Sequence, residues 1–336
     1  MRTPMQMWKQ AEQLLKIPSK PYLNMEVFNT AWRRPRNKVV FILGATGTGK
    51  SRLSIDLATR FSAEIINSDK IQAYKGLDIV TNKVTLEEQC GIPHHLLGIL
   101  QSNTIDFTIR DFCVMATRAV ESIIQKDKIP IIVGGSNTYI ESLVTDPSLG
   151  FNLKYDCCFL WVDVSVTVLR DFVSRRVDKM VESGLIEEVR GIFDPDNTDY
   201  TKGIHRAIGV PELDRYFRDE SFLDELGRVK EVQNAIKAIK DNTCVLADRQ
   251  LEKINRFKHV KRWDLNRLDA TEVFRKMGNK IEADNAWEKL ITRPSYKIVN
   301  KFLRSHDNNF ESNLCAKVLK RSTIASNQAM MTTSNI

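Results

Sequence analysis

A glycine-rich turn carries the residues of this sequence that are best suited to bind an anion. Gly44, Gly49, Lys50 and Ser51 fit the pattern G-x-x-x-x-G-K-[ST]. Glycines let the backbone turn several N–H groups toward one anion, and the N-terminus of a following helix adds partial positive charge. Lys50 adds a full charge, and the Ser51 hydroxyl is a suitable ligand for Mg²⁺. The turn therefore predicts that a di- or triphosphate binds here.

The elements on either side of this turn are those that the pattern requires. Five apolar residues, 39–43, predict a buried strand directly before it. After it, Leu53, Leu57 and Phe61 recur at helical spacing and predict an amphipathic helix. A strand, a phosphate-binding turn and a helix in this order are typical of P-loop proteins.

Strands and helices continue to alternate along the chain. We expect strands at 64–67, 129–133 and 157–162, and a helix at 107–126. This rhythm predicts the α/β class, with a P-loop NTPase-like parallel sheet flanked by helices on both faces. Ligands bind at the carboxyl ends of the strands in such sheets. Polar residues stand at four of those ends, namely Lys50 with Ser51, Asp69, Ser136 with Asn137, and Asp163.

Asp69 follows the strand that comes next after the turn, so we expect it close to the bound phosphate. A carboxylate there can hold Mg²⁺ through water or accept a proton from a nucleophile. The alternative is a helix N-cap, a role that Asp fills well. The strand at 129–133 is followed by Gly-Gly-Ser-Asn. P-loop hydrolases and motors usually have an acid after such a strand, the Walker-B acid, so its absence here disfavours these classes.

Beyond residue 165 the sequence predicts long charged helices. We expect helices at 166–183, 185–193 and 227–256, one late strand within 258–268, and a final helix over 283–303 that is interrupted at Pro294. The expected organisation is a basic N-terminal extension (1–38), a P-loop α/β core (39–165), a smaller helical subdomain that returns to the core (166–304) and a disordered polar tail (305–336).

Composition is that of an ordinary globular protein. The 336 residues are 42% hydrophobic and 27% charged, and the net charge of +8 favours anionic ligands, whether nucleic acid or small phosphates. No apolar run reaches the ~18 residues of a membrane span. The six cysteines show no metal-binding spacing, which predicts buried small hydrophobes in a reducing compartment and disfavours a zinc site. Residues 1–38 hold eight Lys or Arg against two acids, so an organellar transit peptide and a disordered basic leader both remain open.

Eight ordered blocks give the sequence a family resemblance. They are residues 44–51, 66–72 (Ile-Asn-Ser-Asp-Lys-Ile-Gln), 76–83, 93–98 (Pro-His-His-Leu-Leu-Gly), 131–137, 176–182 (Arg-Val-Asp-Lys-Met-Val-Glu), 203–209 and the pair Arg249-Gln250. The chain resembles isopentenyltransferases over about residues 38–300, and it is most similar to the plant adenylate dimethylallyltransferases that make cytokinins.

The resemblance implies a prenyltransferase that moves the dimethylallyl group of dimethylallyl diphosphate to N6 of the adenine of ATP, ADP or AMP, with Mg²⁺ as cofactor. It implies a diphosphate site of Gly44, Ala45, Thr46, Gly47, Thr48, Gly49, Lys50, Ser51 and Arg249, with Mg²⁺ on Ser51. It implies that Asp69 accepts the N6 proton, and that Lys50, Ser51 and Arg249 neutralise the leaving diphosphate. Asp69, Lys202, Arg206 and Lys240 would hold the acceptor nucleotide. The plastid is the compartment that it favours, with the cytoplasm as the alternative.

Two features bear on these assignments. Plant members usually have Cys where this chain has Asp248, and an acid beside Arg249 would weaken donor binding. His94 and His95 match a family block, and we interpret them as structural because no partner acid is evident in the sequence.

Two other functions compete with the main interpretation. A tRNA dimethylallyltransferase shares the fold and the chemistry, and a P-loop small-molecule kinase is the more distant alternative. The eukaryotic tRNA enzymes carry a Cys₂His₂ finger, which does not occur in this sequence, and tRNA members have a larger helical insertion. Both features favour a free nucleotide as the acceptor.

Overall fold

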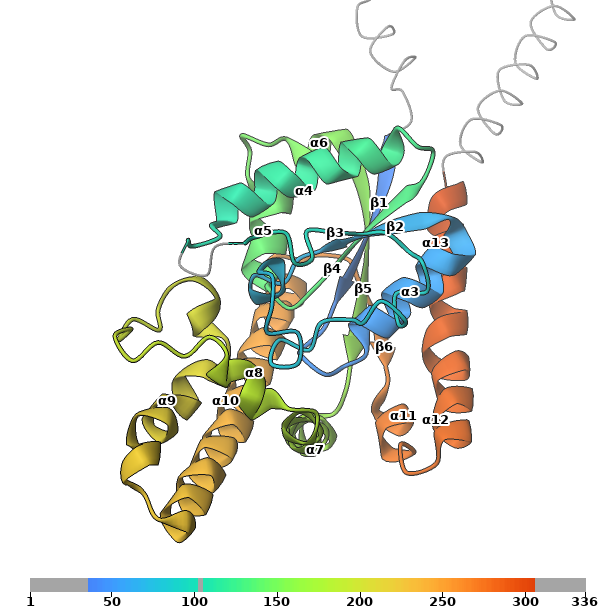
Figure 1. Ribbon diagram of the computed structural model, residues 1–336. Coiled ribbons are helices and arrows are strands. Elements are labelled where there is room, and N and C mark those ends of the chain that lie inside the picture. The colour runs from blue at the N-terminus through green and yellow to red at the C-terminus, as the bar shows by residue number, and fades with distance from the viewer. Residues whose placement is uncertain (1–35, 102–104, 306–336) are drawn as a thin grey trace, which may run out of the picture. The chain divides into compact units, whose positions relative to one another are not determined.

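The computed structural model describes residues 36–101 and 105–305, and it is built on one parallel six-stranded sheet (Figure 1). The strand order is β3-β2-β4-β1-β5-β6. The strands are β1 (Asn37–Leu43), β2 (Ala63–Asn67), β3 (His94–His95), β4 (Ile129–Val133), β5 (Tyr155–Asp163) and β6 (Leu265–Asp269). Every pairing in this sheet is parallel, which confirms the predicted α/β class.

Helices cover both faces of the sheet. Helix α3 (Lys50–Phe61) leads from β1 to β2, whereas α4 (Ile109–Ile124) leads back in the opposite direction along the sheet, from β3 to β4. Because such crossovers are right-handed, opposite directions place α3 and α4 on opposite faces. The short helices α5 (Asn137–Thr145) and α6 (Phe151–Lys154) follow α4, and α13 (Arg293–Arg304) joins α3 (Figure 1).

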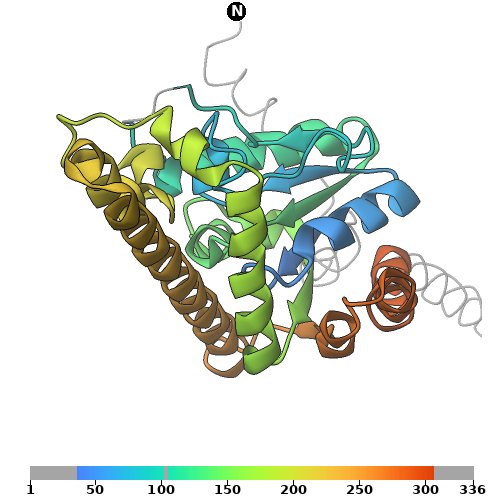
Figure 2. The ribbon, with the colours of Figure 1, turned by 60° about the horizontal axis from the view of Figure 1, so that its bottom comes forward.

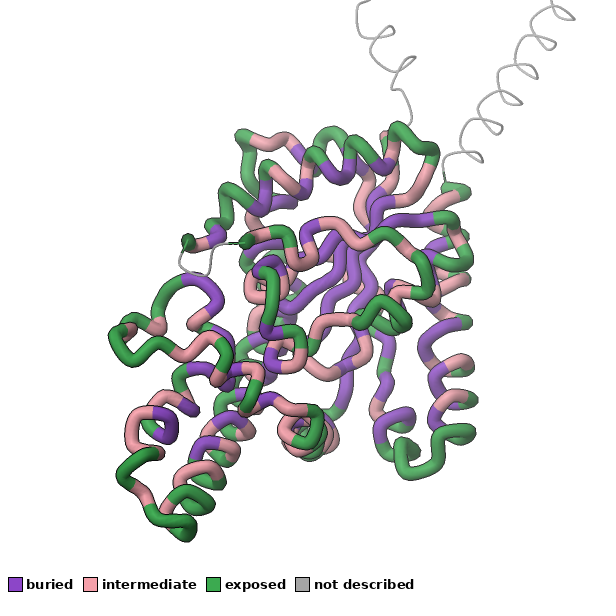
Figure 3. Tube along the Cα trace, in the orientation of Figure 1, coloured by how far each residue is buried: buried purple, intermediate pink, exposed green. Residues whose placement is uncertain are grey.

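The predicted elements of this part are confirmed with small shifts of their ends. Helix α4 begins two residues later than expected, because Thr108 and Asp111 form a capping box that starts it at Ile109. The strand predicted at 129–133 has those bounds. Residues 39–43 of β1 are all buried, and the buried strands at the centre of the sheet stand out in Figure 3.

A group of helices beyond β5 packs beside the sheet. It contains α7 (Val166–Glu182), α8 (Leu185–Arg190), the 3₁₀ turn η2 (Gly203–Arg206), α9 (Val210–Asp219), the 3₁₀ turn η3 (Glu220–Phe222) and α10 (Glu225–His259). Helix α10 is 35 residues long and contacts α9, α7 and α5 (Figure 2). The sequence predicted α7, α8 and α10 but not α9.

The chain then returns to the sheet. The late strand β6 is shorter than the predicted 258–268, because α10 runs on to His259. After α11 (Thr271–Arg275), α12 (Lys280–Trp287) passes through a π-helical turn, Glu288–Thr292, into α13. The helix is not interrupted at Pro294 itself, because the irregular part is the π-helical turn that ends at Thr292, just before it. A proline ring clashes with the carbonyl four residues before it, here Leu290, and the wider turn makes room for the ring.

One prediction about side chains is wrong, and so is the reason given for the structural role of His95. Cys90 is exposed rather than buried, although Cys113 and Cys158 are buried as expected. His95 does have a partner acid, because its Nε2 lies 2.7 Å from the Glu64 carboxylate. Lys126 and Lys128 bind the same carboxylate at 3.0 Å. Glu64 of β2 therefore holds both the neighbouring strand β3 and the connection between α4 and β4. Burial alone would raise the pKa of Glu64, but these hydrogen bonds lower it to about 2.

The predicted terminal segments lie almost wholly outside the described residues. Only 36–38 of the N-terminal extension are described, and Asn37 and Lys38 already belong to β1. Of the predicted tail, only Ser305 is described. Within residues 36–101 and 105–305, no helix has both the length and the apolar character needed to cross a bilayer.

Candidate active site

A cavity of about 630 Å³ lies at the carboxyl ends of β1, β2 and β4. Its walls come from the P-loop, the turns after β2 and β4, the segment around 80–84, and helices α7 and α10. Its charged lining residues in the described part of the chain are Lys50, Lys70, Arg176, Arg206 and Asp69. Four cations against one acid make this cavity a site for anionic ligands.

The P-loop holds Lys50 ready inside the cavity. The Lys50 ammonium donates to the Ala45 carbonyl at 2.5 Å, and the buried Thr48 hydroxyl donates to the same oxygen at 3.0 Å. Burial lowers the pKa of Lys50 to about 8, and the negative charge of Asp69 opposes part of that shift. Binding of an anion beside Lys50 would restore its preference for the charged form.

The C-terminal part of the chain supports the P-loop from behind. Gly49 has φ +90°, and a Cβ there would lie 2.7 Å from the ring of Trp287, so glycine is required twice over. The Trp287 indole donates to the Asp56 carboxylate at 2.8 Å, and the Arg52 guanidinium lies 4.8 Å from its ring centroid. A residue more than 200 positions away in the sequence therefore fixes the shape of the loop.

Arg176 on α7 is a buried cation beside the loop. It donates to the Thr46 hydroxyl at 2.9 Å, while its Nε is buried without a hydrogen-bond partner. Burial lowers the pKa of Arg176 to about 10. No Asp or Glu of the described residues forms an ion pair with it. Since a buried charge is costly unless it is paired, Arg176 is set up to bind an anion next to the P-loop.

Apolar side chains surround this cationic point. Phe172, Arg176 and Met180 are four residues apart on α7 and all line the cavity, so they share one face of the helix. Ile239 and Leu246 of α10 line the cavity as well. This end of the cavity therefore combines a buried cation with apolar walls.

Asp69 lies in a tight turn after β2 that orients its carboxylate. Asn67 accepts from the Asp69 N–H at 3.1 Å and donates to the carbonyls of Asp69 (3.0 Å) and Leu96 (3.1 Å). One carboxylate oxygen of Asp69, Oδ1, accepts from the Ile71 N–H at 3.0 Å. Both interpretations of Asp69 thus have support, since Oδ1 stabilises the turn while the residue also lines the cavity.

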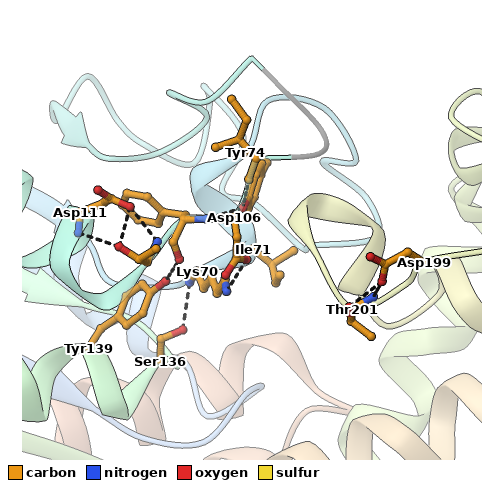
Figure 4. A network of polar contacts seen from close by, with 12 residues as sticks. Lys70, Ile71, Tyr74, Asp106, Asp111, Ser136, Tyr139, Asp199 and Thr201 are labelled. Atoms are coloured by element: carbon orange, nitrogen blue, oxygen red, sulfur yellow. Dashed lines mark hydrogen bonds and ion pairs between the residues drawn. The ribbon is translucent and has the colours of Figure 1, made fainter.

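The turn after β4 is packed directly onto the Asp69 turn. The Ser136 hydroxyl accepts from the Lys70 N–H at 2.9 Å, and the Ser136 N–H donates to the Ser68 carbonyl at 3.2 Å. A Cβ on Gly134 would lie 2.5 Å from the Ser68 backbone. Figure 4 shows the Lys70 side chain directed at Asp106, to which it pairs at 2.7 Å.

Gln250 of α10 connects the two turns. Its Oε1 accepts from the Thr46 N–H at 2.7 Å, and its Nε2 donates to the Gly135 carbonyl at 3.0 Å. Its own carbonyl accepts from the Asn137 side chain at 3.2 Å. Gln250 is buried, and a Cβ on Gly135 would lie 2.5 Å from its Nε2 and 3.1 Å from Asp69 Oδ2. One side chain therefore sets the spacing between the P-loop and Asp69.

The structure brings together only part of the predicted site. Lys50, Ser51, Asp69 and Arg206 line one cavity, as does Ser136. Asp163 lies outside the cavity lining formed by the described residues, since it is buried and accepts from Arg267 at 2.7 Å.

Three predicted basic residues lie away from the described cavity lining. Arg249 is on an exposed side of α10, and its neighbour Asp248 pairs with Arg170 of α7. Lys240 pairs with Asp178 at 2.6 Å, and the exposed Lys202 lies 3.4 Å from Asp199. The roles of Arg249, Lys202 and Lys240 stay predictions.

Sequence reasoning missed Arg176 and Gln250 as site residues, although both fall within the blocks quoted for the resemblance. The resemblance instead indicated Arg249, one position before Gln250, which matches a basic position of the family and whose charge suits a phosphate. A helical register would have favoured Gln250, which is spaced four and seven residues from the cavity-lining Leu246 and Thr243.

Comparisons with known proteins agree with this geometry. A family model described as IPP transferase matches residues 72–152 and 145–256. The chain is 57% identical over 269 residues, 80% of each chain, to adenylate isopentenyltransferase 3, chloroplastic, of Arabidopsis thaliana. It is 59% identical over 276 residues to the chloroplastic adenylate isopentenyltransferase 5 of that plant, and 54% identical over 274 residues to its mitochondrial adenylate isopentenyltransferase 7. These two matches cover 82% and 81% of this chain and 82% of each relative.

A solved structure is also similar. It is that of a eukaryotic dimethylallyltransferase acting on tRNA, with a TM-score of 0.65 and 26% sequence identity, and the match covers 80% of both chains.

Proposed function

This chain belongs to the IPP transferase family, on the adenylate isopentenyltransferase side of it, and we propose that it transfers a dimethylallyl group from dimethylallyl diphosphate to N6 of AMP, ADP or ATP. The product is a prenylated adenine nucleotide, the first intermediate of cytokinin biosynthesis, and diphosphate is released.

One observation carries the proposal. Arg176 is a buried cation beside the P-loop, and Phe172 and Met180 lie on the same face of its helix. In a nucleoside triphosphate the ribose separates the base from the phosphates, so apolar side chains beside the phosphate site would have no apolar group to cover. An allylic diphosphate has both a diphosphate for Lys50 and Arg176 and a five-carbon chain for the apolar residues.

The proposed step is a substitution at C1 of the donor. The C1–O bond breaks, and the diphosphate leaves with the electron pair. Lys50, Arg176 and the N–H groups of the P-loop stabilise the negative charge that develops on it. The lone pair of N6 forms the new C–N bond to C1.

Asp69 is the proposed proton acceptor. The exocyclic amine of adenine is a poor nucleophile because its lone pair is delocalised into the ring. With Oδ1 held by the Ile71 N–H, the other oxygen, Oδ2, is placed to accept from N6–H and then to take the proton. Arg206 of the cavity, and Lys202 earlier on the same segment, are proposed to contact the phosphates of the acceptor.

Mg²⁺ is the proposed cofactor, and the donor atoms available suit it. The described residues contain no cluster of three or more His, Cys, Asp or Glu that would form a cage for a metal. The cavity instead offers the oxygens of Ser51 and Asp69. Mg²⁺ commonly binds through one or two protein oxygens, water and substrate phosphates, so these residues fit a magnesium diphosphate. When bound, the ion would add positive charge at the leaving group.

We propose plastid import for this protein, directed by the basic residues 1–38. The support is the acid-poor composition of that segment and the chloroplastic names of two relatives, although a third is mitochondrial. Residues 1–38 fused to a reporter should carry it into plastids, and a cytosolic reporter would overturn this part of the proposal.

The test of the activity is direct. Purified protein is incubated with Mg²⁺, dimethylallyl diphosphate and AMP, ADP or ATP, or with an unmodified tRNA, and the products are analysed by mass spectrometry. We expect a nucleotide heavier by one five-carbon group. Prenylation of the tRNA alone would favour the tRNA enzyme, and loss of the γ-phosphate of ATP without prenyl transfer would favour a kinase.

A further inference from the structure

The Glu188 carboxylate on α8 accepts hydrogen bonds from the backbone of a segment that is distant in the sequence. Its Oε1 accepts from the Ile79 N–H at 3.0 Å, and its Oε2 accepts from the Val80 N–H at 2.8 Å. Both carboxylate oxygens thus bind two consecutive backbone amides across more than 100 residues of sequence. A charged acceptor makes such bonds stronger than a neutral one does.

Two glycines at helix starts let the segment approach α8 and α9. Ile79 packs against Gly184, the residue before α8, and Val80 packs against Gly209, the residue before α9. A Cβ on Gly209 would lie 3.3 Å from Val80, and the backbone there has φ +118°. The helical group and the segment are therefore fitted closely to each other.

The other side of the segment is tied to the turn that holds Asp69. The Gln72 amide, three residues after Asp69, donates to the carbonyls of Thr81 (3.0 Å) and Asn82 (3.2 Å). Val80, Thr81 and Asn82 line the cavity. Residues 79–82, which we name the acceptor wall, thus run from Glu188 to the neighbourhood of Asp69.

The backbone around the acceptor wall is held in an unfavourable conformation. Leu77 has φ +50°, a region that residues other than Gly, Asn and Asp rarely adopt, whereas Asn82 at φ +49° adopts it at little cost. Such strain persists only where surrounding contacts enforce it. Glu188 supplies two of those contacts, and it does so from the helix that follows the Arg176 helix.

We propose that Glu188 is a positioning residue that shapes the acceptor side of the cavity, and so sets the affinity for the adenine nucleotide without touching it. This inference rests on the proposed function, because it assigns the Asp69 side of the cavity to the acceptor. The donor side, formed by the P-loop and Arg176, shares no hydrogen bond with Glu188 among those of the described residues.

The test compares Glu188→Gln with Glu187→Gln. Glutamine keeps the size of the side chain, but its amide group cannot accept from the second backbone N–H. Glu187 is the adjacent residue, exposed and paired with Arg190 at 3.3 Å, which makes it a matched control. For each variant, binding of ATP and of dimethylallyl diphosphate is measured separately by calorimetry with Mg²⁺ present. Hydrogen exchange is followed at the amides of residues 79 and 80.

We expect Glu188→Gln to weaken ATP binding by up to about tenfold, because the lost hydrogen bond holds the acceptor wall and reaches the nucleotide only through the position of that wall. Donor affinity should stay within about twofold, and amides 79 and 80 should exchange faster. Glu187→Gln should match the wild type in all three measurements. Glu188→Asp, which keeps the charge on a shorter side chain, gives a second variant if the first folds poorly.

Three results would overturn the inference. The two variants could bind ATP equally, Glu188→Gln could weaken both ligands alike, or exchange at 79 and 80 could be unchanged. A failure of the proposed function looks different, because the wild type itself would then form no prenylated nucleotide. If the wild type binds none of AMP, ADP and ATP, both proposals are wrong.

Discussion

The donor end and the acceptor end of the cavity are built in different ways. The end proposed for the donor rests mainly on one continuous stretch, residues 44–51, to which α7 adds Arg176 and which Trp287 supports from behind. The acceptor end is assembled from short pieces, including Asp69, the acceptor wall and Arg206, that come together only in the folded chain. A contiguous motif can therefore be read from sequence, whereas a site assembled by tertiary contacts requires the structure.

The largest effect is expected from a substitution in the P-loop. Lys50→Ala removes a full charge from the cradle of the leaving diphosphate, and we expect the rate of prenyl transfer to fall by ~10²–10³. Circular dichroism and a thermal melt should show that the variant remains folded. A folded Lys50→Ala variant with near-normal turnover would mean that this loop does not handle the reacting diphosphate.

Gln250 tests the connection between the two ends. Gln250→Leu leaves the Thr46 N–H without its partner, and an unpaired buried group costs about 1–3 kcal/mol. The Gly135 carbonyl also loses its bond to Gln250, but it keeps the Asn137 N–H at 2.9 Å. We expect a lower melting temperature and a fall in kcat of about tenfold or more. The control is Glu252→Leu, at an exposed position of the same helix. Equal melting temperatures and rates for the two variants would show that the two turns are positioned independently of Gln250.

Substitutions of two predicted cations, Arg206 and Lys240, test which of them contacts the acceptor nucleotide. Arg206 lines the cavity, and we expect Arg206→Ala to raise the KM for the nucleotide about tenfold, the effect of a lost charged hydrogen bond. Lys240 pairs with Asp178, so Lys240→Ala should change that KM by no more than about twofold. The reverse order of effects, measured by steady-state kinetics, would return Lys240 to the acceptor site.

A smaller effect is expected from pH at the donor end. Lysine is charged below its pKa, and burial lowers the pKa of Lys50 to about 8, so the free enzyme loses this charge between pH 7 and 9. Donor affinity should fall by up to about tenfold over that range when it is measured by calorimetry, in step with the charged fraction of Lys50. In Lys50→Arg the charge persists above pH 9, so its donor affinity should be flat, and an equal fall in both proteins would assign the effect to another group.

Much of the fold could be predicted from the sequence because its signals are local. The apolar runs of β1, β4 and β5 and the amphipathic pattern of α4 gave their positions to within a few residues. The two-residue strand β3 was missed because His94 and His95 carry no apolar pattern, and their place in the sheet depends on pairing with β2. The sequence indicated that Pro294 would disturb the final helix, but the disturbance lies in the helical turn before it, Glu288–Thr292.

The site could be predicted only where chemistry and local geometry coincide. Lys50, Ser51 and Asp69 each follow a strand that ends at the cavity, so position and residue type gave the same answer. Arg249 was favoured over Gln250 because it matches a basic position of the family and its charge suits a phosphate, although the helix turns Gln250 inward. Arg176 and Glu188 act through partners more than 100 residues away, and no local pattern marks such contacts.

The most direct test of the whole account is Asp69→Asn, with turnover and donor affinity measured on the same protein. Asparagine can still accept from the Ile71 N–H, so the turn should be preserved, but it cannot take a proton. We predict that prenyl transfer falls by ~10²–10⁴, the usual contribution of a positioned base, while the Kd for dimethylallyl diphosphate changes less than about twofold. Loss of both would identify Asp69 as a metal ligand instead, and loss of neither would contradict the proposed acceptor site.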